Sequence, residues 1–163
     1  MDPYHFFSIG HGRRSEESFL GLLKQYGVQY LIDVRSKPFS RFNPQYNQRR
    51  LDNFLSAYYI RYVFMGKELG GRPDDPALYD ENGKVSYDLI AQTDLYRSGI
   101  ERLKTAFSKG LPVAIMCSES KPEECHRSRL IGKTLLDEGI TVQHIDENGN
   151  LKEQSAVIDL LKK

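Results

Sequence analysis

The sequence has only two cysteines among its 163 residues, too few for a disulfide framework. We therefore expect both to be reduced thiols. It also lacks any apolar run of about 18 residues, the length that a membrane-spanning helix needs. The start, Met1–Tyr4, has neither the basic nor the hydrophobic part of a signal peptide. These absences predict a soluble, cytoplasmic protein that does not enter a membrane.

The sequence also lacks repeats, low-complexity tracts and linkers. Of its residues 39% are hydrophobic and 28% are charged, which suits a globular chain. A chain of this length can bury one core without help from a metal or a disulfide. We therefore predict a single domain over residues 1–163.

The net charge is only +1, but the basic and acidic residues are distributed unevenly along the chain. Residues 1–72 have 11 Lys or Arg and 6 Asp or Glu, and residues 73–163 have 12 and 16. Most of the positive excess lies between Arg35 and Arg72, where eight basic residues accompany two acidic ones. This basic stretch favours an anionic partner.

Short apolar runs alternate with amphipathic segments along the chain. The expected strands are Tyr4–Ile9, Tyr30–Val34, Ile60–Met65, Val113–Met116 and Thr141–Ile145. The expected helices begin at Ser15, Gln48, Asp88, Ser120 and Gln154 and end near Gly27, Tyr59, Phe107, Glu138 and Lys162, with a break in the third near Ser98–Gly99. This order predicts an α/β fold, a three-layer α/β/α sandwich with a mainly parallel, Rossmann-like sheet of about five strands.

Two connecting segments have no helical or strand periodicity. The long loop from Arg35 to Asn47 is too long for a mere connection and is expected to carry function. The polar stretch from Asp74 to Val85, with a turn at Asn82–Gly83, is interpreted as a flap.

Polar residues follow the predicted strands at the point where each ends. They are His11, Asp33 with Arg35, Gly66 with Lys67, Cys117 with Glu119, and either His144 or Asp146. The carboxyl ends of parallel strands share one edge of the sheet, and ligands of open α/β sheets bind there. We therefore expect these residues to form one site.

Several motifs together resemble the family known as domain of unknown function 488. They are Ser8-Ile-Gly-His-Gly12, Asp33-Val-Arg35 with Pro38, Ser40 and Arg41, Gly66-Lys-Glu-Leu-Gly-Gly-Arg72, Cys117-Ser-Glu119 and Cys125-His-Arg127. The resemblance covers nearly the whole chain in order. It implies a fold and a site but no established reaction.

The cluster contains the parts of a covalent catalyst for a bound anion. Cys117 supplies a thiolate, His126 or His11 a base, and Glu119 lies nearby. Arginine guanidinium groups form bidentate hydrogen bonds with phosphate or carboxylate, and Asp33 can orient one of the arginines. The residues assigned to ligand binding are His11, Asp33, Arg35, Arg41, Lys67, Arg72, Cys125 and Arg127.

The reactivity of the two cysteines depends on where the following helix begins. Ser120 with Glu123 forms a capping-box pattern, so a helix from Ser120 would leave Cys117 just ahead of its positive end. That position lowers the pKa of a thiol and makes Cys117 the more reactive residue. A helix beginning at His126 would transfer the advantage to Cys125.

Two other function classes stay open. Eight aromatic residues lie among the basic ones between residues 35 and 72, which is typical of a nucleic-acid-binding module that prefers single strands. Cys117 and Cys125 could instead form a reversible disulfide, or join His11 and His126 in a zinc site, although the paired spacings of zinc ribbons are absent. We expect no cofactor or metal and a small anionic partner, with a nucleotide-like molecule as one option. The oligomeric state is open.

Overall fold

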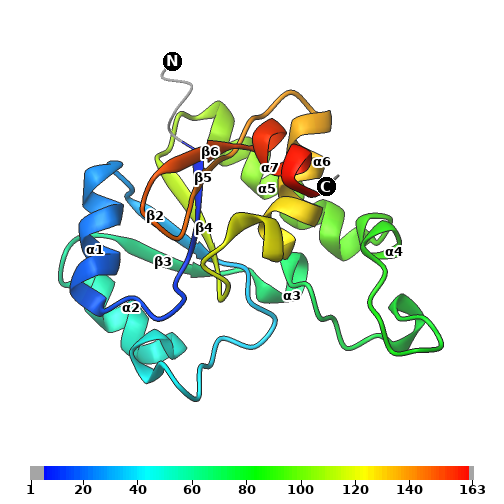
Figure 1. Cartoon of the computed structure of the whole chain (residues 1–163), viewed down its shortest axis with the longest axis horizontal. Coiled ribbons are helices and arrows are strands. Elements are labelled where there is room, and N and C mark those ends of the chain that lie inside the picture. The colour runs from blue at the N-terminus through cyan, green and yellow to red at the C-terminus, as the bar shows by residue number, and fades with distance from the viewer. Residues whose placement is uncertain (1–5, 162–163) are drawn as a thin grey trace.

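A computed structural model describes residues 6–161 and contains a six-stranded sheet (Figure 1). The strands are β1 (Phe6–Gly10), β2 (Tyr30–Asp33), β3 (Arg61–Phe64), β4 (Val113–Cys117), β5 (Gln143–Ile145) and β6 (Leu151–Glu153). Their order is β3-β2-β4-β1-β5-β6, and every neighbouring pair is parallel except β5 with β6. The mainly parallel α/β fold is confirmed.

The central strands are buried on both faces, which explains their unbroken apolar sequences. All five residues of β1 and all five of β4 are buried. Phe6 of β1 pairs with Val113 of β4, and the register continues to Gly10 and Cys117. The two strands therefore end together at one edge.

Two helices cover one face of the sheet (Figure 1). They are α1 (Glu16–Gln25) and α2 (Gln48–Ser56), which bury Leu23 and Leu55 against Phe7 and Ile9 of β1. Ser15 caps α1, because its Oγ accepts a bond from the Ser18 N–H at 3.1 Å. This confirms the cap expected from the sequence.

The other helices lie across the opposite face. They are α3 (Gly66–Leu69), α4 (Tyr87–Ala91), α5 (Asp94–Ser108), a π-helical segment η4 (Arg127–Gly132), α6 (Lys133–Asp137) and α7 (Gln154–Leu161). Leu69 of α3, Leu103 of α5 and Leu135 of α6 pack with Phe6 and Ile115 of the sheet. The molecule is a three-layer sandwich with a core on each side of the sheet.

Two predicted details of these elements differ in the structure. The sheet has a sixth strand, β6, over residues that had no predicted element. The helix expected from Asp88 to Phe107 is interrupted at Thr93, which caps α5 with its Oγ, and not near Gly99. Gly99 lies within α5 because a Cβ there would be 2.8 Å from Leu69 of α3, so the glycine permits close helix packing. Tyr4 and Lys162, the expected ends of the first strand and last helix, lie outside the described residues.

The helix expected from Ser120 to Glu138 also begins later than predicted. A single 3₁₀ turn, η3 (Pro122–Glu124), follows β4, and Cys125 then returns to an extended backbone conformation with φ −124° and ψ 149°. Continuous helix begins only with η4 and proceeds into α6. Cys125, not Cys117, therefore directly precedes the helical segment. Within residues 6–161 no helix combines the length and apolar character needed to cross a membrane.

Candidate functional site

The site lies where β1, β2 and β4 end. β4 is flanked by β1 and β2, whose connections lead to α1 and α2, whereas its own connection leads to η4 on the opposite face. Neighbouring strands that leave toward opposite faces open a crevice beyond their carboxyl ends. The β1–β4 pairing continues into the crevice, because the His11 N–H bonds to the Cys117 carbonyl at 3.0 Å.

A glycine is required at the end of β1. A Cβ on Gly10 would overlap the Glu119 carbonyl, so the loop after β4 can fold over β1 only when this position has no side chain. The Gly12 N–H also bonds to the Ser118 carbonyl at 2.9 Å. The Gly-His-Gly turn therefore supports the segment that follows Cys117.

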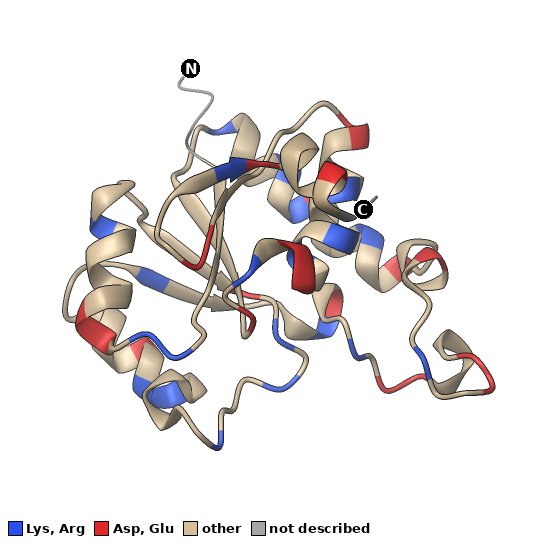
Figure 2. Ribbon diagram, viewed as in Figure 1, with Lys and Arg blue, Asp and Glu red and all other residues tan. Residues whose placement is uncertain are grey.

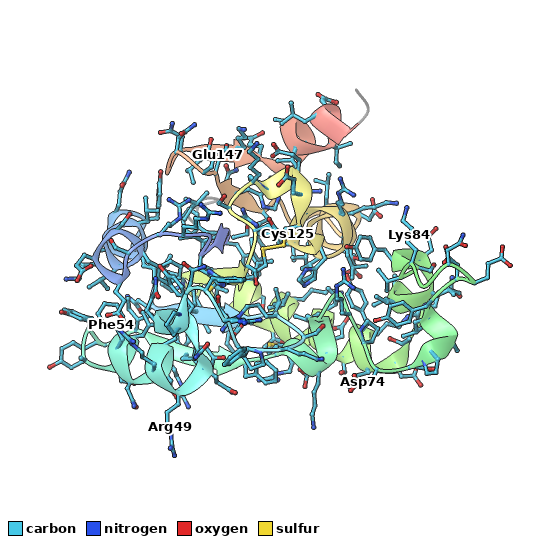
Figure 3. All side chains as sticks on the ribbon, turned by 60° about the horizontal axis from the view of Figure 1, so that its bottom comes forward. Arg49, Phe54, Asp74, Lys84, Cys125 and Glu147 are labelled. Atoms are coloured by element: carbon cyan, nitrogen blue, oxygen red, sulfur yellow. A yellow bond between two sulfur atoms is a disulfide. The ribbon has the colours of Figure 1, made fainter. Side chains whose placement is uncertain are left out.

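A cleft of about 800 Å³ opens at this edge. Its lining comes from four parts of the chain: residues 35–37 after β2, residues 71–74 after α3, the excursion between residues 79 and 87, and residues 117–119 and 124–126 at and after the end of β4. A 3₁₀ turn, η2 (Pro76–Leu78), and a bridge between Tyr79 and Val85 shape the excursion. Figure 3 shows Lys84 and Asp74 on one side of Cys125. The volume suits a small-molecule ligand.

The two cysteines lie on the floor of the cleft and form a disulfide. Both residues are largely buried, with Cys117 2% exposed and Cys125 4% exposed, although both line the cleft. The expectation of two reduced thiols is wrong for this structure. The Cys117–Cys125 pairing considered as an alternative is present, and its reversibility stays a prediction.

The surroundings of the two sulfurs differ. The backbone N–H of Arg127 points to the Cys125 sulfur at 3.5 Å, and Nδ1 of His126 lies 3.6 Å from it. The Cys117 sulfur lies 3.5 Å from the carbonyl oxygen of Glu119. An N–H donor favours a thiolate and a carbonyl oxygen disfavours one. The contacts therefore stabilise negative charge at the Cys125 sulfur and not at the Cys117 sulfur, the reverse of the assignment that depended on a helix from Ser120.

The His126 ring contacts backbone carbonyls and a sulfur. Its Nε2 lies 3.0 Å from the Val34 carbonyl oxygen, and the Leu69 carbonyl is a second hydrogen-bond partner of the ring. Its Nδ1 lies 3.6 Å from the Cys125 sulfur. Burial lowers the pKa of His126 to about 4, so the ring is neutral at physiological pH.

Arg35 and Asp33 form a buried ion pair beneath the cleft. Arg35 donates from Nε and Nη2 to the two carboxylate oxygens at 2.9 and 2.8 Å, and from Nη2 to the Tyr46 carbonyl at 2.7 Å. Tyr62 donates to the same carboxylate at 2.5 Å. Burial and this carboxylate both raise the pKa of Tyr62. Most donors of Arg35 are occupied within the protein, which gives the pair a structural role.

His11 belongs to the same buried group and does not line the cleft. Its Nδ1 donates to the Gly12 carbonyl at 2.9 Å, and its Nε2 faces Nη1 of Arg35 at 3.4 Å. The ring stacks on Tyr46 with centroids 4.4 Å apart. Burial lowers the pKa of His11 to about 4. The structure thus brings His11 to the sheet edge but turns it toward Arg35.

Arg127 lies in the interior, with a fully buried side chain. Its Nη1 donates to Ser8 at 2.7 Å and its Nη2 to the Ser120 carbonyl at 2.9 Å. Burial lowers its pKa to about 9. Ser8 in turn bonds to His144, whose other ring nitrogen meets Gln154. This chain of polar groups fixes the loop after β4, and Arg127 does not line the cleft.

Three cations line the cleft without a carboxylate partner within 4.0 Å among residues 6–161: Lys37, Arg72 and Lys84. Three carboxylates, Asp74, Glu119 and Glu124, are also unpaired there. Figure 2 shows basic residues on the loop after β2 and both signs of charge between α3 and α4. The cations come from three segments away from β4, whereas Glu119 and Glu124 follow β4.

The structure therefore gathers some of the expected site residues and separates others. Cys117, Glu119, Cys125, His126 and Arg72 line one cleft together with Arg35. Lys67 lines a neighbouring hollow of about 470 Å³, which shares Lys37 and Arg72 with the cleft. Arg41 lies over the ring of Phe42 at 5.7 Å, outside both.

Sequence reasoning missed Lys37 and Lys84 as cleft residues. The available signals were their positions, one in the long loop after β2 and the other next to the Asn82–Gly83 turn. Asp146 uses its Oδ1 to accept the N–H groups of Asn148 and Asn150, so it shapes a turn. Over residues 6–161 no three His, Cys, Asp or Glu side chains come together as a metal site.

Comparison with known protein families identifies the family of this chain. The model of a family described as "Domain of unknown function DUF488" matches residues 15–133, which include both cysteines. No curated protein and no solved structure matches the chain.

Proposed function

We propose that this chain, which belongs to the DUF488 family, binds a small phosphate-bearing or otherwise anionic ligand in the cleft and acts on it through a cysteine. The observation that carries the proposal is the position of two cysteines on the floor of a ligand-sized cleft whose walls contain three unpaired cations. Buried thiols with a purely structural role have no need of such surroundings.

The charges in the cleft support an anionic group on the ligand. Lys37, Arg72 and Lys84 are exposed, so binding an anion there requires no ion pair to break. Arg72 can meet a phosphate or carboxylate with two N–H groups, and the lysines add flexible point charges. Glu119 and Glu124 lie beside the cysteines and would repel an anion from that side. The ligand is thus expected to bind with its anionic group toward the cations and its uncharged part toward the sulfurs.

Thermal unfolding in the presence of candidate anions tests this proposal. Inorganic phosphate, sugar phosphates and nucleotides are compared at equal ionic strength, because a ligand that binds only the folded state raises the unfolding temperature. Arg72→Ala and Lys37→Ala are expected to remove the rise. Arg49→Ala is the control, since Arg49 is exposed on α2 and does not line the cleft (Figure 3). An unchanged response in both cleft variants would contradict the proposal.

Nucleic-acid binding is the second candidate, favoured by the loop after β2. Phe39 is 66% exposed and Phe42 is 86% exposed, and Arg41 lies over the Phe42 ring. Exposed aromatic rings beside cations can stack on single-stranded bases. We expect weak, salt-sensitive binding that favours single strands over duplexes. Fluorescence anisotropy with wild type and Phe42→Ala measures it, and tight sequence-selective duplex binding at physiological salt would reverse the order of the two candidates.

A further inference from the structure

Two thiols that reduce another disulfide are themselves oxidised to a disulfide, and Cys117 and Cys125 form a disulfide on the cleft floor. We infer that the cleft is a thiol–disulfide exchange centre, in which reduced Cys125 attacks a small disulfide that carries carboxylates and Cys117 resolves the mixed disulfide. The inference rests on the proposed anion site and names its substrate class.

The contacts of the sulfurs assign the attacking role to Cys125. The Arg127 N–H at 3.5 Å stabilises negative charge on this sulfur, and Nδ1 of His126 lies 3.6 Å from it. Cys125 lines the cleft, so its thiol proton can leave to solvent. The Cys117 sulfur instead lies 3.5 Å from the Glu119 carbonyl oxygen, which offers it no N–H donor.

Cys117 is suited to the second step. It ends β4, whose position is fixed by hydrogen-bonded neighbours on both sides, and its sulfur lies within bonding contact of Cys125. No large movement is needed to bring it to a mixed disulfide on Cys125. The fixed strand and the adjacent loop thus keep the two sulfurs next to each other.

The exchange balances as follows. The Cys125 thiolate attacks one sulfur of the substrate, the substrate S–S bond breaks, and the first thiolate leaves and takes a proton from solvent. Cys117 then loses its proton to solvent and attacks the Cys125 sulfur, which breaks the mixed disulfide and releases the second thiolate to be protonated. One substrate disulfide has become two thiols, and the cysteine pair has been oxidised by two electrons. A dithiol reductant reverses the oxidation of the pair.

Exposure and charge limit the substrate. Cys117 and Cys125 are only 2% and 4% exposed, so a disulfide on the surface of a folded protein cannot reach them, whereas a small extended molecule can. Lys37, Arg72 and Lys84 would meet its carboxylates while its sulfurs approach the floor. The chemistry expected is that of a low-molecular-weight acidic disulfide.

The test uses the full chain, reduced with dithiothreitol and freed of reductant. Three oxidants are compared: dithiodipropionate, which is dianionic, cystamine, which is dicationic, and hydrogen peroxide. We expect dithiodipropionate to oxidise the pair fastest. Cys117→Ser should accumulate a mixed disulfide on Cys125 that mass spectrometry identifies, and Cys125→Ser should react at least about tenfold more slowly. Arg72→Ala should reduce the preference for the anionic probe about fivefold, and Arg49→Ala should leave it unchanged.

Circular dichroism of each variant checks folding, and rapid acid quenching of wild type identifies the first modified cysteine without any substitution. A first mixed disulfide on Cys117, or oxidation by peroxide but by neither disulfide, would overturn the inference. If the thiols are inert while phosphate-type anions still raise the unfolding temperature, the exchange activity fails and the anion site stands. If both disulfides react equally fast and no anion binds, the anion site fails and with it the acidic substrate.

Discussion

Replacing Arg35 with alanine should destabilise the fold strongly, because the change leaves a buried carboxylate without its ion-pair partner. Asp33 is fully buried and accepts two bonds from the Arg35 side chain. The Tyr46 carbonyl and His11 Nε2 lose their contacts with the same guanidinium. Removing one partner of a buried pair costs about 3–5 kcal/mol. Tyr62 and the Arg35 N–H still bond to Asp33, so we expect the lower end, about 3 kcal/mol.

Urea unfolding followed by circular dichroism measures this cost, and Arg50→Ala is its control. Arg50 also pairs with a carboxylate, Glu16 at 2.8 Å, but its side chain is 60% exposed, so the loss should be below about 1 kcal/mol. For a chain of this size 1 kcal/mol corresponds to about 2–4 °C, so Arg35→Ala should lower the unfolding temperature by roughly 6–12 °C. Equal losses in the two variants would refute the structural role of the Asp33–Arg35 pair.

Two further predictions concern buried and close-packed positions. His144 is fully buried, and burial lowers its pKa from the ordinary value of 6.5 to about 3. Between these two pH values the unfolded chain binds a proton at this residue and the folded chain does not, so the free energy of unfolding decreases as the pH falls. From about pH 7 to about pH 5 this residue should lower the free energy of unfolding by about 2 kcal/mol. His144→Gln should therefore reduce the slope of stability against pH, to which His11 and His126 also contribute, and an unchanged slope would contradict this origin. Gly21→Ala in α1 should stabilise by about 0.5–1 kcal/mol, because a Cβ there meets nothing within 4 Å, whereas Gly99→Ala should destabilise by about 1 kcal/mol because its Cβ would lie 2.8 Å from Leu69. Thermal unfolding compares the two alanine variants, and the same sign for both would be the contrary result.

The layer order of the fold could be predicted because each central strand is an apolar run bounded by turn residues. Val113–Met116 is short, apolar and buried on both faces, so periodicity and length sufficed. β6 could not be predicted in this way, since three residues with one apolar side chain give no period. Its pairing with β5 depends on a tertiary contact that local sequence does not encode.

The edge that gathers the polar residues was also predictable, but the direction of each side chain was not. His11 follows β1 and Cys117 ends the neighbouring β4, yet His11 turns toward Arg35 and Cys117 lines the cleft. Strand ends fix where a backbone arrives, and packing decides which way its side chain points. Gly99 gives the same lesson for helices, because a residue that resembles a helix break is required instead for contact with α3.

The late start of the helix after β4 explains why Arg127 has a different position from the one its motif suggests. Because residues 120–126 form a turn and an extended link, the Arg127 side chain reaches back into the interior and its Nη2 holds the carbonyls of Glu119 and Ser120. The backbone N–H of the same residue points to the Cys125 sulfur. One arginine thus fixes the loop that follows Cys117 and contacts the sulfur of Cys125. The short spacing of Cys125 and Arg127 in the sequence is therefore suited to positioning the two sulfurs rather than to gripping the ligand itself.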